Sequence, residues 1–136
     1  MLPAALSFGT GRWMWINLWA AWCGPCKEEL PRLNAWGDKL RAAGAAIDLA
    51  FVSLDDDERQ LTRFLESQSS TSLRASYWLP EGGARATWLG SAGLKEAPEL
   101  PIHLLINPAG DMACLVQGAM EDRDYASVLA FLSVRR

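Results

Sequence analysis

The residues best suited to chemistry are two cysteines three positions apart, Cys23 and Cys26, in the run Trp22-Cys23-Gly24-Pro25-Cys26. Apolar residues recur after them at three- and four-residue spacing, which predicts an amphipathic helix beginning at Cys23. Residues three apart lie on one face of a helix, so a small local change would close a disulfide between them. Gly24 leaves the turn room, and Pro25 occupies a first-turn position where its missing N–H costs nothing.

This placement predicts thiol–disulfide exchange. The helix N-terminus supplies partial positive charge and free N–H groups, which favour a thiolate at Cys23. The thiolate would attack a substrate disulfide, and Cys26 would resolve the resulting mixed disulfide from inside the helix. The same cycle runs in either direction, according to the reduction potential of the pair.

Four other uses of the pair compete with exchange. A structural zinc site needs two more ligands, and only Cys114 and His103 remain as sulfur or nitrogen donors. A copper carrier could combine the two thiolates with His103. A thiol peroxidase would carry Thr three residues before Cys23, where this chain has Ala20. A domain that only binds is the fourth, because a fold does not guarantee an activity. We expect no metal and no cofactor beyond the redox-active pair.

Strand-like and helix-like segments alternate around this motif. We expect strands at 12–19, 47–54, 77–79, 102–106 and 112–117. We expect helices at 23–43, 84–94 and 121–134, and a further helix that follows the capping candidates at 55–57. Pro31 should kink the first helix and Gly44 should stop it. Residues 67–72 should be a polar turn, and residues 107–111 should join the last two strands as a hairpin. The order predicts a three-layer α/β/α domain with a mixed central sheet.

Composition sets the broad class of the chain. Its 136 residues fit one domain, and half of them are hydrophobic. The 13 basic and 16 acidic side chains give a net charge of −3, with no basic run that would suit nucleic acid. We find no segment long and apolar enough to span a bilayer and expect a monomer, with residues 1–11 as an N-terminal extension. The first strand begins abruptly, so a targeting segment or membrane anchor could lie outside this chain.

The segment from Asn17 to Pro31 resembles the active-site strand and helix of the thioredoxin superfamily. More narrowly, the chain resembles the extracytoplasmic, usually membrane-anchored bacterial reductases of the TlpA and ResA type. Three features carry this: Asn17 in place of a buried Asp, the Glu-x-Pro of residues 29–31, and Leu100-Pro101 followed by Leu-Ile-Asn-Pro-Ala-Gly at 105–110. The resemblance is poor across 67–99, which we regard as a variable segment that could face a partner.

The resemblance implies a thioredoxin fold and reduction of protein disulfides outside the cytoplasm, for example in cytochrome c maturation. Its partners would be protein thiols or disulfides and an upstream electron donor. The proline matching Pro101 is cis in that family, and the backbone of the residue before it, here Leu100, can pair with a bound peptide. The alternative for Pro101 is a trans proline that starts an edge strand.

The resemblance also assigns Glu29, which shares a helix face with Cys26, to relay the proton to or from that thiol. The alternative for Glu29 is a solvated helix charge, and Glu28 should point elsewhere. Asn17 would only orient its neighbours. His103 should be a strand residue near the site.

Three further side chains have an expected place. Trp22 should cover the dithiol, or else be a core aromatic, and Trp19 should lie in the core. Cys114 alternates with Met112 and Val116 along its strand, which favours a small buried hydrophobe over a second redox thiol.

Overall fold

The computed structural model describes residues 10–68, 75–95 and 97–134, and its centre is a five-stranded mixed sheet. The sheet order is β3-β2-β1-β4-β5, in which β1, β2 and β3 are parallel and β4 is antiparallel to β1 and β5. The strands are β1 (Trp13–Trp19), β2 (Ile47–Ser53), β3 (Tyr77–Trp78), β4 (Ile102–Ile106) and β5 (Met112–Gln117). The helices are α1 (Gly24–Ala42), α2 (Glu58–Glu66), α3 (Gly83–Ser91) and α4 (Tyr125–Val134), the last preceded by a 3-10 turn at Asp122–Asp124.

The central strand β1 contributes side chains to two hydrophobic cores, because its side chains alternate between the faces of the sheet. Trp15 and Trp19 belong to one core, and Ile16 and Leu18 belong to the other. All four are fully buried. A strand covered on both faces reads as a continuous apolar run, as the sequence does here.

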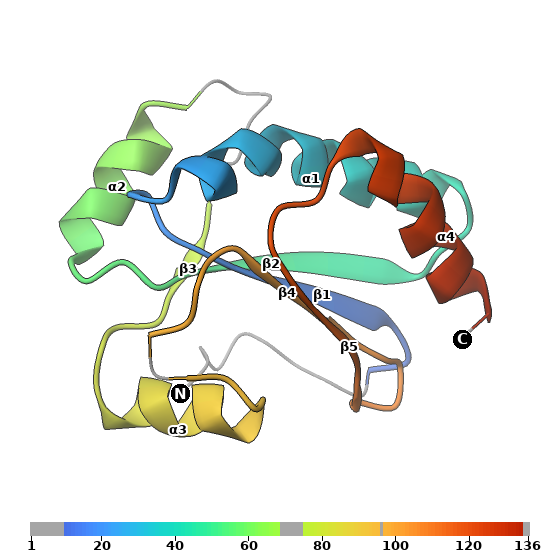
Figure 1. Ribbon diagram of the computed structural model, residues 1–136. Coiled ribbons are helices and arrows are strands. Elements are labelled where there is room, and N and C mark those ends of the chain that lie inside the picture. The colour runs from blue at the N-terminus through green and yellow to red at the C-terminus, as the bar shows by residue number, and fades with distance from the viewer. Residues whose placement is uncertain (1–9, 69–74, 96, 135–136) are drawn as a thin grey trace.

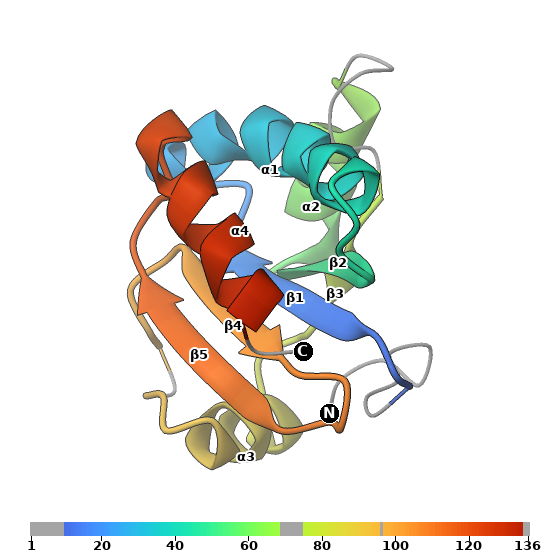
Figure 2. The same ribbon diagram turned by 90° about the vertical axis from the view of Figure 1, so that its right-hand side faces the viewer.

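Helices cover both faces of the sheet, which confirms the predicted three-layer α/β/α arrangement with a mixed sheet. α1, α2 and α4 lie on one face and α3 lies alone on the other (Figure 1). The view along the sheet shows the same separation, with α4 beside α1 and α3 beneath β4 and β5 (Figure 2). Leu89 of α3 packs in the second core, and Leu33 of α1 and Leu132 of α4 pack in the first.

Helix α1 presents the predicted apolar face to the first core. Its buried side chains include Cys26, Leu30, Leu33, Trp36 and Leu40. The helix ends at Ala42, two residues before Gly44, whose φ of 99° is a left-handed conformation suited to glycine. Pro31 lies inside the helix as expected.

Most predicted elements appear within one or two residues of their expected bounds. The strand at Tyr77–Trp78 has two residues, and the helix predicted over 84–94 ends at Ser91. The last helix begins at Tyr125 because the residues before it form the 3-10 turn. Residues 1–9 of the expected extension and 69–72 of the expected turn lie outside the described residues.

The hairpin between β4 and β5 differs from expectation on one strand. Its turn forms as predicted, with the Asn107 side chain accepting a hydrogen bond from the Asp111 N–H. A β-bulge, however, shifts the register so that Leu105 pairs with Cys114 and Ile106 with Met112. Met112 is exposed. Cys114 packs against the first core but is half-buried, so the expected buried hydrophobe is only partly covered.

In the part of the chain that the structure describes, no helix combines the length and the apolar character needed to cross a bilayer.

Candidate active site

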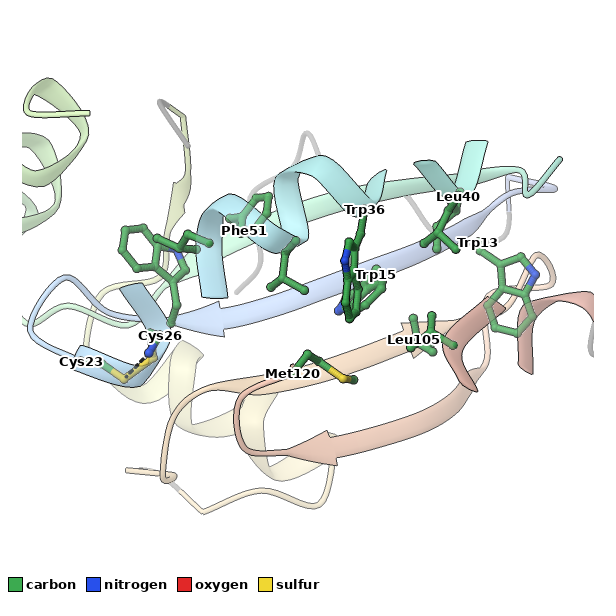
Figure 3. Packing of buried hydrophobic residues seen from close by; sticks show 14 of the residues in the cluster. Trp13, Trp15, Cys23, Cys26, Trp36, Leu40, Phe51, Leu105 and Met120 are labelled. Carbon is green, nitrogen blue, oxygen red and sulfur yellow. Dashed lines mark hydrogen bonds between the residues drawn. A yellow bond between two sulfur atoms is a disulfide. The ribbon is translucent and has the colours of Figure 1, made fainter. Parts of the chain in front are cut away.

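Cys23 and Cys26 form a disulfide at the start of α1, as their spacing predicts. Their Cα atoms are 5.3 Å apart, inside the normal range for a disulfide. Cys23 is the N-cap of the helix, and its Sγ accepts a hydrogen bond from the N–H of Cys26 at 3.3 Å. Figure 3 shows the pair at one end of the first core. Cys23 is 5% exposed and Cys26 is fully buried, so Cys23 is the sulfur that a partner can reach.

The Leu100–Pro101 peptide bond is cis, as the resemblance implies, and the trans alternative was wrong. Ile102 pairs with Leu18 in the sheet, so Pro101 lies at the edge where β1 ends and the chain turns toward Cys23. Leu100 packs against the core that contains both cysteines. The proline and the dithiol motif therefore lie at the same end of the two neighbouring strands β1 and β4, although 75 or more residues separate them in sequence.

The structure has a groove of about 400 Å³ whose lining includes the residue directly before Cys23 but neither cysteine. Trp22 and Leu100, which precede the reactive cysteine and the cis proline, form part of its wall. The other lining residues are Leu54, Asp56, Glu81, Arg85, Ala97 and Pro98. Trp22 is 61% exposed, so the alternative that it is a core aromatic was wrong. Trp19 is in the core as predicted.

Glu29 is fully buried, which rules out a solvated helix charge, whereas its neighbour Glu28 is exposed. Its Oε2 accepts a hydrogen bond from the N–H of Met120 at 2.6 Å, and its Oε1 accepts one from Nδ2 of Asn17 at 3.3 Å. Both carboxyl oxygens therefore act as hydrogen-bond acceptors. Glu29 follows Cys26 by three residues in α1, so the two side chains share a helix face.

His103 lies next to Glu29 in the same buried cluster and is 1% exposed. Its Nδ1 is 3.0 Å from the indole Nε1 of Trp15, and the two rings meet edge to face. Its Nε2 is 3.3 Å from Oε1 of Glu29. Asn17 lies directly opposite His103 in the β1–β4 register, and its Nδ2 is 3.5 Å from Nδ1 of His103. The sequence predicted a strand residue near the site, but not this contact with Glu29.

Asp55 supports the loop that leads to the dithiol, a role that the sequence did not predict. Its carboxylate is fully buried and accepts the N–H of Ala21 at 2.9 and 3.0 Å. The Ser53 hydroxyl lies 2.5 Å from the same carboxylate and donates to it. We predicted helix capping for residues 55–57, and only Asp57 caps α2, with its side chain accepting the Arg59 N–H. The only available signal for Asp55 was an acidic residue directly after a buried strand.

No group of three His, Cys, Asp or Glu residues that could hold a metal ion occurs among the described residues. The copper site considered from the sequence would need the sulfur atoms of Cys23 and Cys26 and a ring nitrogen of His103 to face one metal position. In this structure the cysteines bond to each other, and the ring nitrogens of His103 face Trp15 and Glu29.

The sequence matches the model of the AhpC/TSA family over residues 4–122. A relative, the thiol-disulfide oxidoreductase ResA of Oceanobacillus iheyensis, is 26% identical over 110 residues, which cover 81% of this chain and 52% of that protein. The thioredoxin-like protein YneN of Bacillus subtilis is 29% identical over 72 residues, or 50% of this chain and 40% of that protein. The chain thus spans about half the length, or less, of these curated relatives.

Solved structures share the fold. A putative thiol:disulfide interchange protein DsbE from Chlorobium tepidum superposes with a TM-score of 0.71 at 22% identity, covering 93% of this chain and 82% of that one. The exposed lipoprotein thioredoxin Etrx1 of Streptococcus pneumoniae gives a TM-score of 0.70 at 20% identity, covering 90% and 87%. At these identities the likeness concerns the fold, and the expected thioredoxin fold is confirmed. With the family model matching most of its length, the chain belongs to the AhpC/TSA family.

Proposed function

We propose that this chain is a thiol–disulfide oxidoreductase that reduces or exchanges protein disulfides through Cys23 and Cys26. The observation that carries the proposal is the Cys23–Cys26 disulfide at the N-terminus of α1, directly after Trp22, which lines the groove together with Leu100. This arrangement gives one accessible and one buried sulfur, which is what attack followed by resolution requires. The curated relative named a thiol-disulfide oxidoreductase supports the same activity.

In the reduced protein, Cys23 is the nucleophile. The helix N-terminus and the N–H of Cys26 stabilise negative charge on its Sγ. The Cys23 thiolate attacks one sulfur of the substrate disulfide, which forms a mixed disulfide and releases the other substrate sulfur as a thiolate.

Cys26 completes the turnover, and Glu29 takes its proton. As the Cys26 sulfur bonds to the Cys23 sulfur, the mixed disulfide breaks and the second substrate sulfur leaves as a thiolate. The Cys26 proton passes to the buried carboxylate of Glu29, and in the reverse direction Glu29 returns it. The shared helix face and the full burial of the carboxylate away from solvent support this assignment.

The substrate is an extended peptide segment that carries a disulfide. Within the described part of the chain, the N–H and C=O of Leu100 make no backbone hydrogen bond, so both are available to a peptide strand in the groove. Pro101 shapes this edge, and the exposed indole of Trp22 offers apolar surface to the same segment. Gly24 and Pro25 are exposed beside the cysteines and leave the approach to Cys23 open.

The setting we propose is extracytoplasmic, with an anchor outside this chain and an upstream electron donor that restores the dithiol. The resemblance to the TlpA and ResA type supports it, as does the structural neighbour from Streptococcus pneumoniae, which is an exposed lipoprotein. Cytochrome c maturation is one process that would supply suitable substrates. Labelling of the full-length protein in intact cells with a membrane-impermeant thiol reagent, after reduction of the Cys23–Cys26 disulfide, tests the location, and protection of the reduced Cys23 would contradict it.

Trapping the mixed disulfide tests the activity. Incubation of reduced Cys26→Ser protein with a disulfide-containing protein should give a covalent complex, visible by mass and lost on reduction, because the resolving thiol is missing. Cys23→Ser is the matched control and should give no complex. Wild-type protein should reduce the substrate without accumulating the adduct. A Cys26→Ser protein that traps nothing, or a Cys23→Ser protein that still turns over, would contradict the assignment.

The same variants separate exchange from the competing functions. Consumption of peroxide by the wild type at a rate that exceeds disulfide reduction would favour a thiol peroxidase. The sequence argues against that function, because Ala20 stands where a thiol peroxidase would have Thr. Stoichiometric copper binding that is lost in both cysteine variants would favour a carrier.

A further inference from the structure

His103 is the one histidine of the sequence, and it lies between two groups that define its protonation. On one side Trp15 contacts its Nδ1, and on the other Glu29 contacts its Nε2. All three side chains are at most 1% exposed, so water does not screen these contacts.

The Trp15 contact fixes which ring nitrogen carries the proton. An indole N–H can only donate, so Nδ1 of His103 must accept it with a lone pair. The amide nitrogen of Asn17 also lies 3.5 Å from Nδ1, but its hydrogens have acceptors in Oε1 of Glu29 and the carbonyl of Ile102, so Trp15 is the donor that decides the tautomer. A proton on Nδ1 would set N–H against N–H at the Trp15 contact. His103 is therefore a neutral imidazole whose single proton is on Nε2.

The Nε2–H group faces the carboxylate. Nε2 lies 3.3 Å from Oε1 of Glu29, but the alignment falls short of a hydrogen bond, and among the described residues this atom has no hydrogen-bond partner. A buried donor without a partner is unfavourable. A small movement of the carboxylate would complete the bond and offset that cost.

We propose that His103 is a positioning residue for Glu29, held as the neutral Nε2–H tautomer by Trp15 so that it directs a donor to the Glu29 carboxylate. The inference deepens the proposed function and rests on it for its kinetic consequence. The neutral state matters, because an imidazolium at 3.3 Å would stabilise the carboxylate strongly and make it a poorer base toward Cys26. A neutral donor orients the carboxylate on the Cys26 face of α1 while leaving it able to accept a proton.

The tautomer is measurable without any activity. A long-range proton–nitrogen correlation spectrum of nitrogen-labelled oxidised protein contains one imidazole, so the assignment is direct. We expect a neutral ring with its proton on Nε2 and a Trp15 indole proton shifted by its hydrogen bond. In Trp15→Phe, which keeps an aromatic ring but removes the donor, the spectrum should show loss of the single fixed tautomer. A proton on Nδ1 or an imidazolium in the wild type would overturn the proposal.

Loss of His103 should slow only the step in which Cys26 attacks the mixed disulfide. Reduced protein is mixed with an equal amount of dithiobis(nitrobenzoate) in a Cys114→Ala background, which removes the third thiol. Attack by Cys23 releases the first coloured thiolate, and attack by Cys26 on the mixed disulfide releases the second. His103→Leu should slow the second release about tenfold, equivalent to about 1.4 kcal/mol of barrier, and leave the first unchanged. His103→Gln, which retains an amide donor, should recover part of the rate.

A double variant shows whether the effect passes through Glu29. In the Glu29→Gln background, His103→Leu should cause no further slowing of the second release, because the carboxylate that it positions is gone. Equal slowing of both releases by His103→Leu, no rescue by His103→Gln, or an undiminished effect in the Glu29→Gln background would each overturn the proposal. If wild-type protein gives no second release, the proposed function itself fails, while the tautomer measurement still stands.

Discussion

Replacing Asp55 by Ala should destabilise the protein far more than an ordinary acidic substitution. The carboxylate is fully buried and accepts hydrogen bonds from two donors, the Ala21 N–H and the Ser53 hydroxyl. A hydrogen bond to a charged group contributes about 1.5 to 3 kcal/mol, so the loss of both sets a range of about 3 to 6 kcal/mol. Ala21 is half-buried and water can reach its N–H in the variant. We therefore expect about 3 kcal/mol, at the low end of that range.

Urea unfolding of the oxidised protein measures this loss. With a slope of about 2 kcal/mol per molar urea, the midpoint should fall by about 1.5 M. Asp55→Asn keeps one acceptor oxygen and should lose less. Asp56→Ala is the matched control, because Asp56 is exposed and should change the free energy of unfolding by less than about 0.5 kcal/mol. If Asp55→Ala and Asp56→Ala shift the midpoint equally, the account of the dithiol loop is wrong.

Three further changes test the packing and the surface. Trp36→Ala should cost about 3 to 5 kcal/mol in urea unfolding, because its buried ring packs on Trp15 and Tyr125; a loss below about 1 kcal/mol would contradict this packing. Gly90→Ala should stabilise α3 by about 0.5 to 1 kcal/mol, since its Cβ would meet open space inside a helix, and a lower melting temperature would refute it. The hydrogen bond from Arg12 lowers the pKa of Asp48 from its ordinary value, so Asp48 stabilises the fold above its unfolded pKa and loses that effect as pH falls through the folded one. The pair is half exposed, so Asp48→Asn should cost under about 1 kcal/mol at neutral pH and progressively less as the pH falls through the lowered pKa of Asp48, and a cost that does not change with pH would refute the assignment.

Local patterns predicted the elements well because the forces that form them are local. The spacing of Cys26, Leu30 and Leu33 predicted both α1 and its buried face, and the apolar run of β1 predicted a strand covered on both sides. The dithiol followed from spacing alone. The cis bond at Pro101 required the resemblance to a known family, because it has no local cause that a single sequence reveals. The burial of Glu29 was one of two outcomes left open by its position on the helix face of Cys26.

The contacts that were missed join residues far apart in the chain. Trp15 and His103 are 88 positions apart and meet only because β1 pairs with β4 in the register that sets Asn17 opposite His103. In the sequence, Asp55 is one of three candidate capping residues. In the structure, the turn after β2 places its carboxylate where it accepts a hydrogen bond from the Ala21 N–H. Cys114 is half-exposed because β5 is an edge strand, and the β-bulge breaks the alternation of Cys114 with Met112; neither feature leaves a mark in the apolar pattern.

The central claim, that Cys23 and Cys26 form a working redox couple, is tested most directly by equilibrating the protein with glutathione buffers. The Cys23–Cys26 equilibrium can be followed by tryptophan fluorescence, with Cys23→Ser as control. We predict a reversible two-electron transition that is absent in the control, with a potential near about −270 mV for a reductase. A value near about −120 mV would mark an oxidant instead. The absence of any reversible transition in the wild type would contradict the claim.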